Sequence, residues 1–155
     1  MNFIKKLVAT LVLVASVAVI PLPAMAATSN GVRGERVVRM ALSYLGRPYA
    51  FGANGPRAFD CSSFTRHVMA RAVGIRLPRT SRSQSTVGRR IARTALQPGD
   101  LVFFENTWRR GVSHVGIAMG NGRMVHAFPR RGVTIDRLSH SYLASRYYSS
   151  RTVLR

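Results

Sequence analysis

A series of short apolar segments separated by turns fills the C-terminal part of the sequence and constrains the fold most strongly. We expect strands at residues 101–105, 114–119 and 123–128, a short fourth strand at 133–135 and a last one near 151–154. Glycine, proline and asparagine lie between these segments, which is typical of turns. Short strands joined in this way indicate an antiparallel sheet of about five strands.

Helical patterns dominate the part of the chain that precedes the strands. Apolar residues at helical spacing predict helices at residues 35–45 and 61–73, with a short helix near 81–87 and a helical patch at 139–145. Residues 46–59 are rich in glycine, proline and asparagine and should form a loop. Helices followed by an antiparallel run of strands predict an α+β fold.

The N-terminal 26 residues have the pattern of a secretory signal peptide. A short basic start precedes an apolar run at residues 7–20, which is shorter than the ~20 residues that a membrane span needs. Ala24-Met25-Ala26 then supplies the small residues of a cleavage site. We therefore expect export to the periplasm or the extracellular cell wall, a short flexible lead at 27–35 and one domain at 36–155, with no later membrane span.

The sequence is strongly basic. It has 24 lysines and arginines against five acidic residues, and every basic residue outside the predicted signal peptide is an arginine. Such a surface attracts polyanions. The arginines are scattered along the chain, and export argues against nucleic acid, so we expect anionic cell-envelope polymers as partners and no nucleic acid. A codon bias that enriches arginine without a functional reason is the alternative.

The chain has a single cysteine, Cys61, which therefore cannot form an internal disulfide. A buried small hydrophobic residue is one interpretation, because free cysteines are commonly buried. However, Asp60 is a good helix N-cap, which places Cys61 at the first position of the helix at 61–73. The positive end of a helix favours a thiolate, and its free N–H groups can hold a developing oxyanion. The position therefore favours a nucleophile.

Two of the four histidines are candidates for the base that a thiol nucleophile needs. His67 lies too far along the helix of Cys61, and His140 lies in a polar stretch where we expect it to be exposed. His114 and His126 lie on strands that Gly120-Asn121-Gly122 connects. A two-residue turn would put these histidines on opposite faces, whereas a three-residue loop with an adjacent bulge puts them on one face. We predict the three-residue loop, with the helix of Cys61 packed over the histidine face.

Several motifs, taken together and in this order, resemble the NlpC-type cell-wall cysteine peptidases over roughly residues 36–155. The resemblance implies a papain-like fold in which the nucleophile begins a helix that packs against a sheet bearing its base. The matching motifs are Pro48-Tyr49, Phe59-Asp60-Cys61-Ser62, Leu77-Pro78-Arg79-Thr80-Ser81, Pro98-Gly99-Asp100-Leu101-Val102-Phe103-Phe104, His114-Val115-Gly116-Ile117 and Gly120-Asn121-Gly122-Arg123-Met124-Val125-His126-Ala127.

The resemblance implies a role for each of three side chains. Cys61 would be the nucleophile, and His114 would be the general base and acid. His126 would be the third polar residue, which orients His114 and stabilises its imidazolium. No metal or organic cofactor is implied, since a cysteine and two histidines are better explained as an acyl-transfer set.

Tyr49, Asp60 and Ser62 match family positions beside the thiol, and we place them in the oxyanion and substrate-binding part of the site. Packing of the Tyr49 ring on the sheet is the alternative for that residue. Asp60 either only caps the helix or also meets the free amine of an L-alanine stem peptide. The chain departs from the family at Ala53 and Ser63, where glycine is common, and both positions should border the cleft.

We therefore predict a monomeric, exported cysteine endopeptidase that hydrolyses peptidoglycan stem peptides through a thioester acyl-enzyme. The bond between the γ-carboxyl of D-glutamate and the following diamino acid is the expected target. Trp108-Arg109-Arg110 and the other arginines would attract anionic wall components. The alternatives are a related thiol amidase or acyltransferase, a secreted antibacterial effector, and a non-catalytic basic protein that binds the wall.

Overall fold

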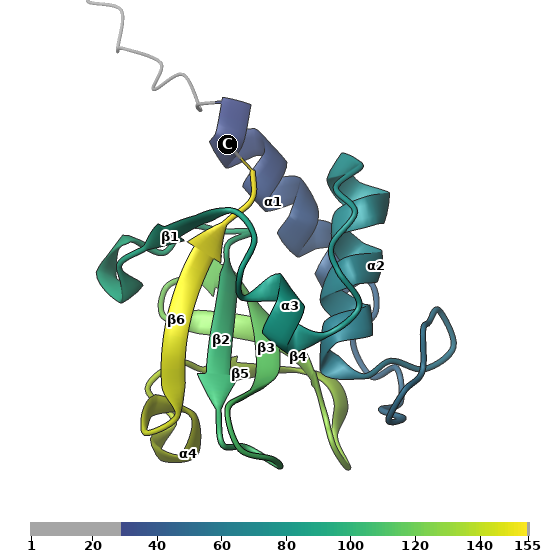
Figure 1. Ribbon diagram of the computed structural model, residues 1–155. Helices are drawn as coiled ribbons and strands as arrows, with labels where there is room; N and C mark the ends of the chain where they lie inside the picture. The colour runs from purple at the N-terminus through teal and green to yellow at the C-terminus, as the bar shows by residue number, and fades with distance from the viewer. Residues whose placement is uncertain (1–28, 155) are drawn as a thin grey trace, which may run out of the picture.

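A computed structural model describes residues 29–154, so the predicted signal peptide lies outside the described residues. Six antiparallel strands form one sheet in the order β1-β6-β2-β3-β4-β5 (Figure 1). The α+β class predicted from the sequence is confirmed. The strands are β1 (Arg89–Ile91), β2 (Leu101–Glu105), β3 (Val112–Gly120), β4 (Arg123–Phe128), β5 (Gly132–Arg137) and β6 (Tyr147–Thr152).

The sheet has one strand more than the sequence predicts. Two of the three residues of β1 are exposed arginines, so this strand has no alternation of apolar and polar residues that would reveal it. Its backbone pairs with β6, where Arg90 lies opposite Arg151. The last strand also begins earlier than expected, at Tyr147 rather than near Arg151.

Two longer helices, α1 (Ser29–Leu42) and α2 (Cys61–Val73), lie side by side against the sheet (Figure 1). Three shorter helical segments complete the described chain: α3 (Ser81–Gln84), the 3₁₀ turn η1 (Arg93–Ala95) and α4 (Ser141–Ala144). Within the part of the chain that the structure describes, none of these helices combines the length and apolar character of a membrane span.

The first helix begins at Ser29 and not at Glu35, so most of the segment expected to be a flexible lead is helical. Close packing explains this early start. A Cβ atom on Gly34 would lie only 2.0 Å from the carbonyl oxygen of Pro98, and the Arg33 guanidinium donates to the carbonyl of Leu154 at 2.8 Å. These contacts outweigh the weak helix propensity of the glycines and polar residues in the segment.

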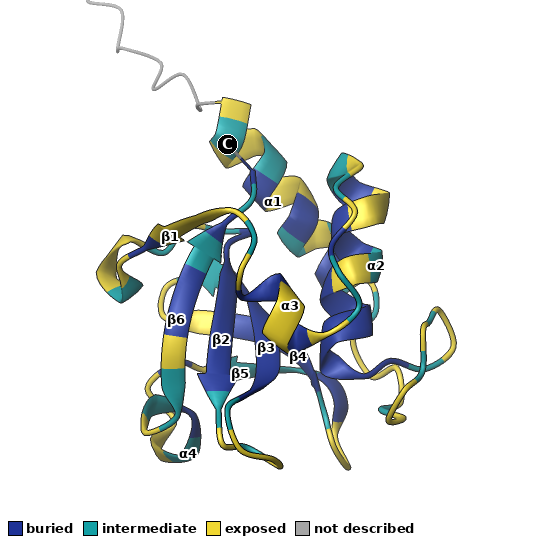
Figure 2. Cartoon of the chain, viewed as in Figure 1, coloured by how far each residue is buried: buried dark blue, intermediate teal, exposed yellow. Residues whose placement is uncertain are grey.

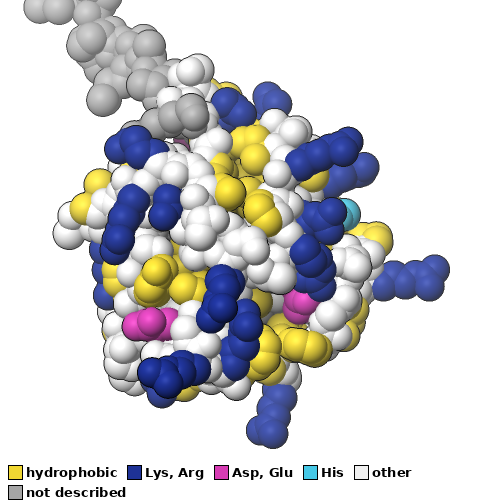
Figure 3. Space-filling view, in the orientation of Figure 1, with side chains coloured by type: hydrophobic (Ala, Val, Ile, Leu, Met, Phe, Trp, Pro, Cys, Tyr) yellow, Lys and Arg dark blue, Asp and Glu magenta, His cyan; other side chains and the backbone are white. Residues whose placement is uncertain are grey.

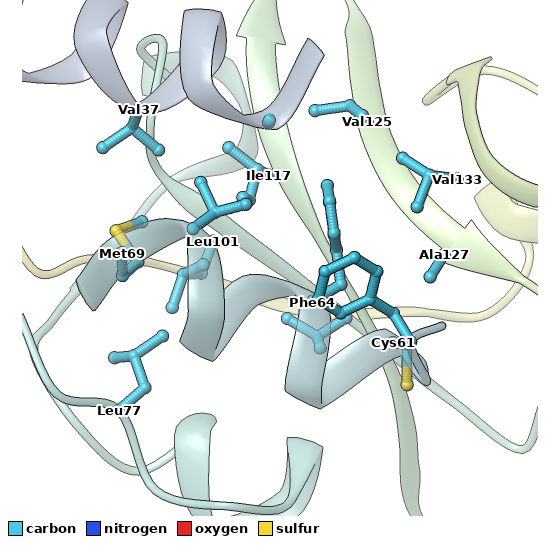
Figure 4. Close-up of a cluster of buried hydrophobic side chains, with 14 of the residues drawn as sticks. Val37, Cys61, Phe64, Met69, Leu77, Leu101, Ile117, Val125, Ala127 and Val133 are labelled. Atoms are coloured by element: carbon cyan, nitrogen blue, oxygen red, sulfur yellow. The ribbon is translucent and has the colours of Figure 1, made fainter. Parts of the chain in front are cut away.

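The main hydrophobic core lies between α1, α2 and one face of the sheet. Phe64 and Met69 of α2, Val37 of α1 and Ile117 of β3 are fully buried in this core (Figure 4). Val115 of β3 belongs to the same cluster. Figure 2 shows β2 and β3 buried along most of their length. Burial of a large side chain such as Phe64 contributes about 1.5–3 kcal/mol.

The hairpin between β3 and β4 differs from the predicted one in its turn but not in its consequence. Gly120 pairs with Arg123, so the turn has two residues, with Asn121 and Gly122 at φ values of 53° and 68°. This conformation is typical of a type I′ turn. A bulge inside β3, between Ala118 and Gly120, shifts the register by one residue, so that Ile117 pairs with Val125. The predicted three-residue loop is therefore wrong, whereas the predicted common face of the two histidines is confirmed.

The helix of Cys61 does not cover that face. Val115 and Ile117 pack against α2, whereas His114 lies opposite Phe104 in the register of β2 and β3, on the other side of the sheet. A second core closes that side and includes Val102, Phe104, Ala118, Met124, Leu138 and Leu143. The prediction that α2 packs over the histidines is therefore wrong, because the apolar residues of β3 attract the apolar side of the helix.

Candidate active site

A capping box holds the start of α2. The carboxylate of Asp60 accepts from the Ser63 backbone N–H at 2.7 Å, and the Ser63 hydroxyl accepts from the Asp60 N–H at 3.0 Å. The predicted cap at Asp60 and the predicted end at Gly74 are both confirmed. Ser63 is buried in this cap and does not line the pocket around Cys61, so the expectation that it borders the cleft is wrong.

Cys61 lies at the edge of the main core and lines a pocket of about 380 Å³. Its sulfur points away from the Phe64 cluster (Figure 4), and the residue is 6% exposed. Its thiol donates to the backbone carbonyl of Ser113 at 3.9 Å. The pocket is lined by Tyr49, Phe51, Gly52, Asp60, Cys61, Ser62, Arg79, Thr80, Ser81, Trp108, Arg109 and Ser113.

The backbone of β3 beside Cys61 carries His114, which is buried and begins a chain of polar contacts. Nε2 of His114 lies 2.7 Å from Nδ1 of His126. Nε2 of His126 lies 3.0 Å from a carboxylate oxygen of Asp136, and the Arg131 guanidinium holds that carboxylate at 2.8 and 3.0 Å. The structure thus brings together the two predicted histidines, and it adds Asp136 and Arg131, which sequence reasoning missed.

The resting charge of the cysteine and the histidine follows from their burial. Burial raises the pKa of the Cys61 thiol to about 12, and the negative charge of Asp60 acts in the same direction. The N–H groups of Val115, Ser62 and Cys61 itself favour the thiolate but do not offset burial. Burial, followed by the neighbouring His126, lowers the pKa of His114 well below its ordinary value. Both the Cys61 thiol and the His114 imidazole are therefore neutral at rest, despite the position of Cys61 at a helix start.

Asp136 is ionised. The hydrogen bond from His126 is the main reason that its pKa lies below the ordinary range, and the contact with Arg131 adds to this effect. Burial lowers the pKa of His126, although Asp136 opposes that change. The outer end of the chain is therefore a carboxylate that can only accept hydrogen bonds.

The Asp60 carboxylate, which we predicted to bind substrate, already accepts several hydrogen bonds within the protein. Both oxygens of Asp60 accept from the Arg79 guanidinium, at 3.2 and 2.7 Å, and the Gly52 N–H and the Ser62 hydroxyl also donate to it. Arg79 donates in addition to the Ser62 hydroxyl at 3.1 Å and to the Ala53 carbonyl at 3.3 Å. Asp60 and Ser62 thus line the pocket as parts of an ion-paired network that sequence reasoning did not foresee.

Aromatic side chains surround the mouth of the pocket. The pKa of Tyr49 is raised to about 12 by burial and by the nearby Cys61 and Asp60, so its hydroxyl stays protonated and can donate. Phe51 and Trp108 are 75% and 53% exposed, with ring centroids 5.3 Å apart. The Trp108 indole N–H donates to the Ser113 carbonyl at 2.7 Å, which ties this lip to the strand beside Cys61.

The other two histidines do not reach the pocket. His67 contacts the Tyr44 hydroxyl at 2.9 Å, and His140 is exposed at the start of α4. Among residues 29–154 no group of three or more histidine, cysteine or acidic side chains is arranged to hold a metal ion. Arginines are spread over the face of the molecule that Figure 3 shows, as their scatter in the sequence leads one to expect.

Comparison with known proteins assigns the family. The model of the NlpC/P60 family matches residues 46–152. The gamma-DL-glutamyl hydrolase of Bacillus subtilis is 43% identical over 111 residues, which are 71% of this chain and 27% of that protein. The probable endopeptidase NlpC homolog of Haemophilus influenzae is 34% identical over 127 residues, which are 81% of this chain and 67% of that protein.

A crystal structure of an NlpC/P60 family protein from Bacillus cereus superposes with a TM-score of 0.74 at 31% identity, covering 79% of this chain and 40% of the other. The chain thus spans about a quarter of the Bacillus subtilis relative and less than half of the Bacillus cereus protein. The matched region includes the helix of Cys61 and both histidine strands. The chain belongs to the NlpC/P60 family.

Proposed function

We propose that this protein is a cysteine peptidase of peptidoglycan, with Cys61 as nucleophile, His114 as general base and acid, and His126 as the residue that orients His114. The observation that carries this proposal is the position of Cys61. Its thiol begins α2, lines a pocket, and lies against the part of β3 that bears a buried, neutral histidine. A structural cysteine would need neither the pocket nor the paired histidines.

The first chemical step uses the neutral pair. As Sγ of Cys61 attacks the carbonyl carbon of the scissile bond, its proton passes to Nδ1 of His114, because Nε2 already contacts His126. The thiol bonds to the Ser113 carbonyl in the resting state, so rotation of the side chain toward the imidazole accompanies attack. Hydrogen bonds to a base are commonly looser before substrate binds.

The oxyanion and the leaving group are served by neighbouring groups. The N–H groups of Cys61 and Ser62 face the sulfur at the positive end of α2, which suits them to hold the developing oxyanion. The Tyr49 hydroxyl is a further donor. The proton on His114 then passes to the leaving amine. The amine departs, and the acyl group remains on Cys61 as a thioester. Water activated by His114 hydrolyses that thioester and frees the thiol.

The substrate assignment rests on the relatives and on the charge of the pocket. One relative is named gamma-DL-glutamyl hydrolase, and a solved NlpC/p60 domain belongs to a peptidoglycan hydrolase, SagA, with a TM-score of 0.68 and 30% identity over 77% of this chain and 98% of that domain. A γ-linked D-glutamate keeps a free α-carboxylate, which suits a pocket that includes Arg79 and Arg109. The proposed scissile bond joins that γ-carboxyl to the diamino acid.

The proposal includes export of a monomer to the periplasm or cell wall, where the arginines attract anionic envelope polymers. Arg109 and Arg110 serve as a test of that attraction, since Arg109 lies at the pocket and packs over Trp108 at 5.0 Å. Reversal of both charges should weaken binding to whole cell walls and reduce its salt dependence. Unchanged binding and salt dependence would contradict this part of the proposal.

Defined muropeptides test the reaction itself. Purified protein is incubated with tripeptide and tetrapeptide stems, free and glycan-linked, and the products are identified by mass spectrometry. The proposal predicts products cut between D-glutamate and the diamino acid from the wild type and none from Cys61→Ala. Release of whole stem peptides from the glycan would instead indicate an amidase, and products from both proteins would exclude Cys61 as the nucleophile.

A further inference from the structure

The hydrogen bonds beyond His126 determine which nitrogen of His114 carries a hydrogen. We propose that Asp136, held by Arg131, is a positioning residue that fixes the tautomers of both histidines, so that His114 presents an unprotonated Nδ1 to Cys61. This inference rests on the proposed function, but part of its test needs no substrate. Neither Asp136 nor Arg131 touches the pocket around Cys61.

Three consecutive contacts define the chain. His114 Nε2 and His126 Nδ1 are 2.7 Å apart, and His126 Nε2 and Asp136 Oδ2 are 3.0 Å apart. The third contact is bidentate, from the Arg131 guanidinium to both oxygens of Asp136 at 2.8 and 3.0 Å. A further bond from Arg131 to the Thr134 hydroxyl at 3.1 Å holds the guanidinium to β5. Each contact is within the range of a good hydrogen bond.

The carboxylate determines where every proton in the chain lies. An ionised Asp136 can only accept, so Nε2 of His126 must carry a hydrogen. Neutral His126 then has a lone pair on Nδ1, and the hydrogen shared with His114 must belong to Nε2 of His114. Neutral His114 therefore has its lone pair on Nδ1, which is the nitrogen that must receive the thiol proton. The opposite tautomer of His126 would reverse the order and leave His114 unable to act as the base.

The surroundings of the rings make this control necessary. Phe128 contacts both histidines, with ring centroids 5.5 and 5.3 Å away, and Phe104 contacts His114 at 5.9 Å. These apolar walls hold the rings in place but offer no oxygen or nitrogen that would select a tautomer. The charged or titratable groups that face His126 are His114 on β3, Asp136 on β5 and Arg131 in the turn between β4 and β5.

Arg131 stabilises the Asp136 carboxylate at the outer end of this series of hydrogen bonds. Its side chain is 48% exposed, whereas that of Asp136 is 13% exposed, so the guanidinium lies between the carboxylate and solvent. Two charge-assisted hydrogen bonds keep both carboxylate oxygens occupied and stabilise the ionised form. Loss of Arg131 should therefore weaken the control of tautomers less than loss of Asp136 does.

The experiment compares Asp136→Asn, Arg131→Gln and a control, Glu35→Gln, which removes a carboxylate from the exposed ion pair with Arg39. We expect Asp136→Asn to lower kcat about 10²–10³-fold while KM changes less than about threefold, since loss of the comparable carboxylate in serine proteases costs about 10⁴-fold in kcat. Arg131→Gln should lower kcat about tenfold or less, and Glu35→Gln should leave it unchanged. Asp136→Asn activity within about threefold of the wild type would overturn the proposal.

Side-chain ¹⁵N NMR reads the tautomers directly and needs no substrate. The proposal predicts a hydrogen on Nε2 of both histidines in the wild type, and loss of this pattern in Asp136→Asn. A wild-type spectrum with the hydrogen of His114 on Nδ1 would overturn the proposal even if Asp136→Asn does not fold. Failure of the wild type to cut muropeptides, with the predicted tautomers present, would instead refute the proposed function alone.

Discussion

Replacement of Gly116 by alanine should disturb the histidine pair without removing any polar group. A Cβ atom at this position would lie 2.8 Å from the Met124 sulfur, 3.2 Å from Cβ of His126 and 3.4 Å from the Val125 carbonyl oxygen. The Met124 side chain can move, but the backbone of β4 is paired on both sides and cannot easily give way. The new methyl group should therefore push His126 away from His114.

The magnitude follows from the crowding. An added methyl group in a closely packed core costs about 1–3 kcal/mol, which corresponds to a decrease in Tm of about 4–8 °C per kcal/mol for a domain of about 100 residues. A displacement of His126 by a few tenths of an ångström lengthens its 2.7 Å contact with His114. We expect kcat to fall about tenfold, less than the about 10²-fold loss that a 1 Å misplacement causes.

Thermal unfolding and steady-state cleavage of a defined muropeptide measure both effects. The matched control is Gly74→Ala, at the C-terminal end of α2, where φ is +73° and no atom lies within 4 Å of the new Cβ. Strain in this left-handed conformation costs about 1–2 kcal/mol, so stability should fall by a similar amount with kcat unchanged. Equal losses of kcat in the two variants, or none in Gly116→Ala, would refute the reasoning.

The remaining predictions concern charge. Arg79→Gln leaves the buried Asp60 carboxylate with fewer hydrogen-bond donors. We expect the free energy of unfolding in urea to fall by about 1–3 kcal/mol, which is less than for a fully buried pair because Arg79 is partly exposed. A change below about 0.5 kcal/mol would contradict this prediction. The value of kcat/KM should persist down to about pH 6.5 and fall only at more acidic pH, because burial lowers the pKa of His114. In the unfolded chain His114 and His126 bind a proton below about pH 6.5, whereas burial opposes this in the folded protein. The free energy of unfolding should therefore also decline as the pH falls below that value. Asp136, whose folded pKa is lowered, adds a second loss below about pH 4. An acidic limb of kcat/KM centred above pH 7 would be inconsistent with a neutral, buried His114.

Local chemistry explains which parts of the fold could be predicted from the sequence. Asp60 and Gly74 act on their own helix, so the bounds of α2 were confirmed at both ends. The strands around His114 and His126 also have strong apolar patterns. By contrast, β1 is held by its backbone pairing with β6, and the start of α1 by the contact of Gly34 with Pro98. Neither tertiary contact has a local signal.

The hairpin shows how a correct consequence can follow from a wrong detail. Asn121 and Gly122 favour a two-residue turn, and the structure has that turn. The bulge in β3 between Ala118 and Gly120 then supplies the shift that was expected from a longer loop. No residue type marks this bulge clearly, because Met119 is compatible with a regular strand. Turn propensity was thus the better guide to the turn itself, whereas the requirement that the two histidines meet was the better guide to the face that they share.

The polar network around the site was the least predictable part. Asp136 and Arg131 come from β5 and the turn before it, and their side chains meet His126 only because β4 and β5 pair in the register that places His126 opposite Thr134. Arg79 reaches Asp60 from the segment after α2. The sequence does hold one signal for Asp60 and Asp136. They are two of only five acidic residues in a sequence with 24 basic ones.

The acyl-enzyme provides the most direct test of the central claim that Cys61 is the nucleophile. Purified protein is mixed with a defined stem peptide, quenched in acid within milliseconds to seconds, digested and examined by mass spectrometry. If Cys61 is the nucleophile, a transient adduct equal in mass to the acyl part of the substrate forms on the peptide that contains Cys61 and disappears as product accumulates. Cleavage at full rate without an adduct, together with activity in Cys61→Ala, would contradict this claim.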